Sequence, residues 1–156
     1  MSGLDSEDPD DVGKKRPSTD YVLAMVCEGM LKEGKFRGEL VDGLKEGKGV
    51  CEYQEGIVYE GEFRRGLREG MGLLAVEEEI MYRGFWKNGM MEGKGQLFVL
   101  EGEIDSYEGH FKEGRLEGVG SMKLKSGKRI TGHWSDGKMV GPCFEHLGSS
   151  KRFRAV

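Results

Sequence analysis

The side chains with the clearest potential for chemistry are two histidines and one cysteine in the C-terminal half of the chain. His110 and His133 occupy the same position in two successive copies of a repeated pattern, so they should lie close together on neighbouring hairpins. Cys143 is a candidate third ligand, since zinc is bound by histidine nitrogen and cysteine sulfur. No metal-ligand spacing motif joins the three residues, and two histidines alone are more often a surface ladder. We therefore expect no metal centre and no cofactor.

The other patterns that indicate catalysis are missing from the sequence. There is no Ser/His/Asp set within reach, no phosphate-binding loop and no carboxylate pair in a predicted cleft. The glycines match no G-x-G-x-x-G segment that leads into a helix. We expect a protein that is not an enzyme, and the functional question becomes which partner it binds.

A repeated pattern of glycine and aromatic residues organises most of the chain, which contains 27 Gly among 156 residues. The order is aromatic–x–Gly–x–aromatic–x–x–Gly–x–x–x–Gly–x–Gly, and the copies start at Phe36, Tyr59, Tyr82, Tyr107 and Ile130. A fixed period of this length indicates a stacked array of small units rather than a globular core with a buried pocket.

Each copy reads as one β-hairpin. Its first residues alternate as in a strand, and pairs such as Asp42-Gly43 and Asn88-Gly89 follow as a strong turn signal. The glycine between the two large side chains leaves a bare slot over which a ring can lie. We predict an all-β fold: an elongated, twisted, single-layer antiparallel sheet of tandem 23-residue β-hairpin repeats.

Four segments are predicted along the chain. Residues 1–20 read as a disordered tail of acidic and basic residues. Ser18 there follows a basic run and is either a phosphorylation site or part of a solvated tail, the interpretation that we favour. Residues 21–35 read as an N-terminal capping strand, and 153–156 as a truncated sixth repeat. The five repeats span 36–58, 59–81, 82–106, 107–129 and 130–152.

Composition narrows the classes of partner and the compartment. The net charge of −4 argues against nucleic acid, which rewards a strong basic excess. Cys27, Cys51 and Cys143 are far apart and read as reduced thiols. The acidic N-terminus does not resemble a secretory leader, and no apolar run reaches the length of a membrane span. A cytoplasmic location is expected.

The repeated pattern resembles the MORN repeat (membrane occupation and recognition nexus) over about residues 36–152. The resemblance implies a binding surface rather than a reaction, and a cytoskeletal, ciliary or membrane-proximal scaffold. One departure is consistent: many copies in the family carry His before the third glycine of the pattern. Here that position holds Glu46, Glu69, Glu92, Glu117 and Val140, which lines one edge with carboxylates and weakens an inference of binding to anionic surfaces.

Two classes of function compete. The first is a protein-binding scaffold or adaptor that holds a peptide or helix of a partner along a groove. Its terminal sheet edges could also pair with another chain, which leaves end-to-end self-association open. The second is a peripheral membrane module that binds acidic phospholipid. That needs a basic stripe, whereas the cations here alternate with acidic residues, so the lipid interpretation ranks below the scaffold.

Two sets of residues are candidates for partner contact. The aromatic residues mainly pack against one another, but part of their surface should stay accessible in a single layer. The middle repeats are the best candidates: Tyr59, Phe63, Tyr82, Trp86, Tyr107 and Phe111. On the opposite face, Leu73, Phe85 and Phe98 interrupt the polar pattern. Either they form a contact patch or the apolar run 21–27 covers them.

Overall fold

The computed structural model describes residues 16–147 and 150–155, with side chains placed for 16–146. One helix, α1 (Thr19–Cys27), precedes a series of strands. The strands are β1 (Glu33–Val41), β2 (Leu44–Tyr53), β3 (Ile57–Arg64), β4 (Leu67–Val76), β5 (Glu79–Lys87), β6 (Met90–Phe98), β7 (Ile104–Lys112), β8 (Arg115–Leu124), β9 (Arg129–Ser135), β10 (Lys138–Leu147) and β11 (Ser150–Ala155). A 3-10 turn, η2 (Gln54–Gly56), links β2 to β3.

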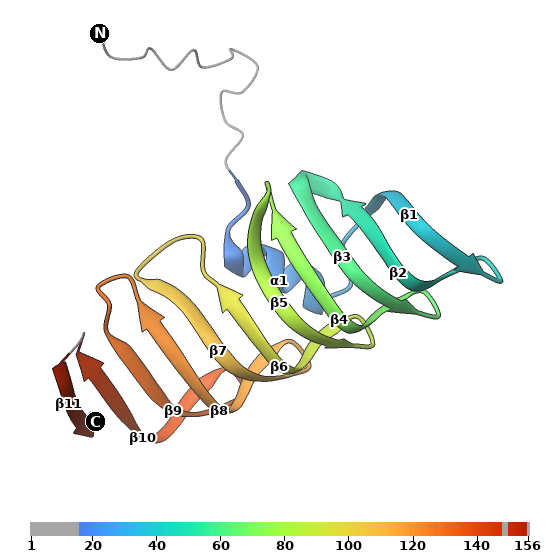
Figure 1. Ribbon diagram of the computed structural model, residues 1–156. Coiled ribbons are helices and arrows are strands. Elements are labelled where there is room, and N and C mark those ends of the chain that lie inside the picture. Colours follow the sequence, from blue (N-terminus) through green and yellow to red (C-terminus); the bar gives the residue numbers. More distant parts are fainter. Residues whose placement is uncertain (1–15, 148–149, 156) are drawn as a thin grey trace, which may run out of the picture.

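The strands form one sheet in which spatial order follows sequence order from β1 to β11. Every neighbouring pair is antiparallel. The sheet is open, elongated and twisted, and it is not backed by a second sheet (Figure 1). The predicted all-β array of tandem hairpins is therefore confirmed.

A column of glycines fixes the register across the sheet. Gly38 of β1 lies opposite Gly49 of β2, Gly49 lies opposite Gly61 of β3, and the column continues without a break to Gly132 of β9. A slip of one residue would turn every ring to the other face and break this alignment. In β10, Cys143 takes the place of the next glycine, and its Cβ lies against Gly132.

The hairpin turns carry two residues with positive φ, as a type I′ turn requires. Arg65 (φ 49°) and Gly66 (φ 86°) form one such turn, and the equivalent pairs share this conformation. Each later turn is anchored to the repeat before it: the Arg65 amide donates to Glu46 Oε2 at 2.9 Å. The same bond joins Asn88 to Glu69, Glu113 to Glu92 and Asp136 to Glu117. The carboxylate edge thus holds successive hairpins together.

The apolar run near the N-terminus forms α1 and not the predicted capping strand. Ser18 caps the helix, because its Oγ accepts a hydrogen bond from the Tyr21 amide at 3.1 Å. This also corrects the end of the predicted tail, since Arg16 pairs with Glu79 at 2.6 Å. Residues 1–15 of that tail lie outside the described residues. The last segment, β11, pairs with β10.

Candidate binding groove on the aromatic face

The rings of the repeated pattern form one continuous ladder on a single face, which we call the aromatic face. It runs from Phe36 to Trp134, alternating between the first and fifth positions of the repeats. Tyr59 meets Phe63 and Trp86 edge-to-face, with ring centroids 5.0 and 5.2 Å apart. The same contacts recur with Tyr82 and Tyr107 at 5.1–5.4 Å. Edge-to-face pairs of this kind stabilise beyond the area they bury.

Each tyrosine of the ladder lies flat over two glycines. A Cβ added at Gly72 would stand 2.2 Å from Tyr59 Oη, so only glycine leaves room for the ring. The Tyr59 hydroxyl donates to the Glu62 carbonyl at 2.8 Å, and Tyr82 and Tyr107 make the equivalent bond. Burial raises the pKa of the Tyr59 and Tyr82 phenols well above their usual range.

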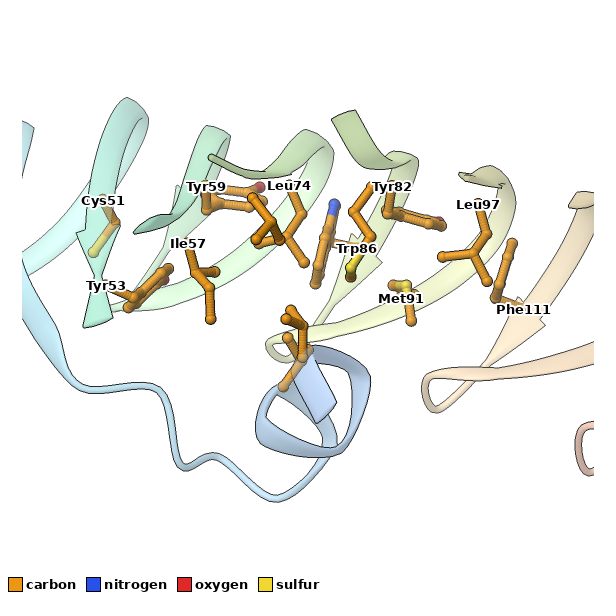
Figure 2. Close-up of a cluster of buried hydrophobic side chains, with 14 of the residues drawn as sticks. Cys51, Tyr53, Ile57, Tyr59, Leu74, Tyr82, Trp86, Met91, Leu97 and Phe111 are labelled. Atoms are coloured by element: carbon orange, nitrogen blue, oxygen red, sulfur yellow. The ribbon is translucent and has the colours of Figure 1, made fainter. Parts of the chain in front are cut away.

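The six aromatic residues proposed from sequence as a contact surface are buried, whereas part of their surface was expected to stay accessible. Tyr59, Phe63, Tyr82, Trp86, Tyr107 and Phe111 are all no more than 4% exposed. Neighbouring rings cover part of their surface. Helix α1 covers a further part of the aromatic face. Its residues Val22 and Val26 belong to the same buried cluster, and the helix lies directly beneath the central strands (Figure 2).

Polar contacts hold α1 in place at its N-terminal end. The Thr19 amide donates to Glu101 Oε1 at 2.6 Å, and Thr19 Oγ1 accepts from the Leu100 amide at 3.0 Å. Arg16 donates to the Leu100 carbonyl, and the Tyr21 hydroxyl donates to Glu55. Because these partners come from loops on two sides of the central strands, the position of the helix on the sheet is fixed at several points.

An open groove remains beside α1 on the aromatic face, over β6 to β8. Its volume is about 520 Å³. One wall is the helix, through Thr19, Asp20 and Leu23. The floor comes from the sheet and is mainly apolar: Leu97, Val99, Ile104, Tyr107, Phe111, Leu116 and Met122. Leu23, Leu116 and Met122 are only partly buried, so they present apolar surface to the groove.

The charges around the groove are unevenly distributed. Asp20, Glu101 and Glu103 line it near the N-terminal end of α1, and Arg115 lines it near the hairpin turns. The side chains of Asp20 and Glu103 accept no hydrogen bond and form no ion pair with any of the described residues. One end of the groove therefore carries carboxylates that have no partner among the described residues.

The opposite, outer face holds Leu73, Phe85 and Phe98, which the sequence suggested as a patch. Helix α1 does not cover them, because it packs on the aromatic face. Phe85 is 47% exposed and shares a hollow of about 460 Å³ with Met71. Phe98 lines a different hollow of about 210 Å³, and the Arg83 guanidinium lies over its ring at 5.7 Å. Phe85 and Phe98 thus line separate hollows, and Leu73 lines neither of them.

The candidate metal ligands are also dispersed. His110 is on β7 and His133 on β9, with β8 between them. Within residues 16–147 and 150–155, no three His, Cys, Asp or Glu side chains are grouped closely enough to hold a metal ion. In the same part of the chain, no helix has the length and apolar character needed to cross a membrane.

The groove could not be found from the repeat pattern alone. Its floor residues Leu97, Leu116 and Met122 stand at regular positions of the repeat, where packing is the expected role. What makes them a site is the helix beside them. The one available signal was Ser18 followed by an apolar run, which is an N-terminal capping pattern for a helix.

Comparison with known families and proteins adds one positive result. The model of the MORN repeat matches residues 36–58, 59–74, 82–98, 107–129 and 131–150. A comparison with curated proteins found no match to the chain.

Proposed function

The chain belongs to the MORN repeat family, whose repeats are associated with binding proteins or membranes, and from this premise we propose a non-catalytic protein-binding adaptor. Its partner contributes an amphipathic helix that lies in the groove beside α1. The setting that we propose is a cytoskeletal, ciliary or membrane-proximal assembly. The observation that carries the proposal is the half-open apolar groove lined by Leu23, Leu116 and Met122.

A helix suits this groove better than an extended peptide. On the face of a sheet the backbone groups are already used in the ladders between strands, so an added strand would find no hydrogen-bond partners. A helix satisfies its own backbone and needs only apolar contact. α1 already packs on the same face in this way through Val22 and Val26. A second helix would lie next to it, against Leu23.

The charged residues around the groove favour partner helices of one charge over another. Asp20 and Glu103 favour basic residues at the end of the partner helix that reaches them. The same carboxylates oppose an acidic phospholipid headgroup. These charges therefore favour a cationic amphipathic segment over a lipid surface as the occupant.

A peptide titration with the full chain tests the proposal. Three labelled probes are used: a leucine–lysine amphipathic helix, its leucine–glutamate counterpart, and a scrambled leucine–lysine peptide with no apolar face. Binding is measured by fluorescence anisotropy. Met122→Gln alters the groove floor, and Val119→Gln is its matched control, because Val119 is exposed on the other face of the same strand.

The expected result is that only the leucine–lysine helix binds, and that Met122→Gln weakens it on the order of tenfold, as loss of one buried apolar contact would. Val119→Gln and the double variant Phe85→Ser/Phe98→Ser should leave its affinity unchanged. Equal binding of the scrambled peptide, or loss of binding only in the double variant, would refute a groove site. Flotation of the wild type on acidic vesicles would favour the membrane alternative.

A further inference from the structure

The N-terminal edge of the sheet is open. β1 pairs with β2 on one side, and no described segment pairs with its other side. An edge strand of this kind presents a row of free backbone donors and acceptors to another chain. It spans nine residues, long enough to form a full ladder with a partner strand.

Apolar side chains at this edge of the sheet are left exposed to solvent. Leu40 stands at the fifth position of its repeat and is 57% exposed, whereas the equivalent Phe63, Trp86, Phe111 and Trp134 are at most 4% exposed. Each of those four rings packs against a ring of the preceding repeat, which Leu40 lacks. Val41 and Leu44 beside it are also exposed.

Two charges of β1, those of Arg37 and Glu39, have no partner within the described part of the chain. Arg37 lies opposite Val50, and Glu39 lies opposite another carboxylate, Glu46. Both Arg37 and Glu39 are exposed, and neither forms an ion pair or side-chain hydrogen bond with a described residue. Charges on an edge strand ordinarily discourage pairing. Here, however, a basic residue precedes Gly38 and an acidic residue follows it. If a second β1 strand pairs antiparallel with the first, each basic residue lies opposite an acidic one.

We propose that two copies of this chain join through their β1 strands, antiparallel, about a two-fold axis at Gly38. This register extends the glycine column into the second copy, as Gly38 meets Gly38. On the outer face it places Arg37 of each copy opposite Glu39 of the other, so the interface contains two such pairs. On the aromatic face it places Leu40 opposite Phe36 of the second copy. The product is one continuous sheet of twice the length.

The surroundings of Leu40 in this register differ from those of its equivalents inside the array. There a ring at the fifth position lies opposite a glycine, as Phe63 lies opposite Gly47 and Trp86 opposite Gly70. Across the proposed two-fold axis Leu40 lies opposite Phe36, so two apolar side chains face each other at each end of the pairing.

Charge reversal at two positions tests both the dimer and its register. Arg37→Glu places two glutamates opposite each other at each pair, and Glu39→Arg places two arginines there. The double variant Arg37→Glu/Glu39→Arg restores opposite charges. Mass is measured by light scattering and sedimentation velocity over a concentration series of the full chain, which weighs 17.4 kDa as a monomer.

The wild type and the double variant should form dimers, and each single variant should dissociate with a constant raised about tenfold or more by like charges facing each other. An equal mixture of the two single variants should recover the dimer, because both charges on the edge of one chain are then acidic and face two basic side chains on the edge of the other. A wild type that stays monomeric at all concentrations overturns the proposal. So does a dimer that the single variants leave unchanged.

Discussion

The contact between Tyr59 and the glycine column can be tested by a single added methyl group. Gly72 has no left-handed φ, so alanine is compatible with its backbone. In the native arrangement the new Cβ would lie 2.2 Å from Tyr59 Oη and 2.4 Å from Tyr59 Cε2. These distances are at least ~1 Å short of ordinary contact at ~3.4–4 Å. The ring must therefore move off the strand.

The magnitude follows from what that movement costs. Forcing one methyl group into a packed core destabilises by about 1–3 kcal/mol. Displacing the ring also breaks the 2.8 Å hydrogen bond from the Tyr59 hydroxyl to the Glu62 carbonyl, which contributes about 1 kcal/mol. We expect Gly72→Ala to lower the free energy of unfolding by about 2–4 kcal/mol, or about 5–15 °C in Tm for a chain of this length.

Gly34→Ala is the matched control. Gly34 is also in a strand without a left-handed φ, but a Cβ there meets only the Glu52 carbonyl oxygen, at 3.6 Å. Urea unfolding is followed by circular dichroism for the sheet and by tryptophan fluorescence for Trp86, which contacts Tyr59. In a Tyr59→Ala background, Gly72→Ala should cost little, because the two changes share one contact. If Gly72→Ala were no more destabilising than Gly34→Ala, the idea that glycine is required beneath the ring would be wrong.

Two further predictions concern the hairpin anchors and the buried phenols. Glu92→Ala removes the carboxylate that accepts from the next turn at 2.8 Å, and we expect a loss of about 1 kcal/mol in urea unfolding; an unchanged midpoint would show that the turn does not depend on this bond. Burial raises the pKa of Tyr53 from 10.0 to about 12. Because the native state holds this proton more tightly than the unfolded state, its contribution is complete below pH 10.0 and is lost as the pH rises from there through about 12. Absorbance at the phenolate band during alkaline titration checks this, with Tyr53→Phe as the control; normal titration of all tyrosines would contradict it.

The hairpins could be predicted from the sequence because few residue types are tolerated in the turns and at the glycines beneath the rings. Arg65-Gly66 and Glu113-Gly114 adopt the same positive φ values as the Asp-Gly and Asn-Gly turns, although arginine and glutamate are poor candidates there. The anchors from Glu46 and Glu92 supply a reason, since each holds the amide of the following turn. The sequence showed the repeated glutamate only as an edge lined with carboxylates. Its partner amide is in the next repeat, which the pattern of one repeat cannot show.

Helix α1 was missed because its apolar spacing is ambiguous. Val22 and Val26 share a face in a helix, where residues four apart align, and also in a strand, where every second residue aligns. Only the cap distinguished the two, through Ser18 and the acidic first turn at Asp20. The secondary structure of a short apolar segment is determined largely by the surface against which it packs, and here that surface is formed by residues distant in sequence.

The misassigned helix and the groove beside it have the same physical origin. A single-layer sheet with large rings on one face must cover that face, and the repeats themselves bury only the rings. α1 covers the remaining apolar surface around Ile57, Leu74 and Met91, which are fully buried. One helix of nine residues is too small to cover all the strands, and this leaves the surface around Leu116 and Met122 half open beside Leu23. The length of α1 thus determines where the groove lies: a longer helix would close the groove, and a chain without the helix would expose the ladder itself.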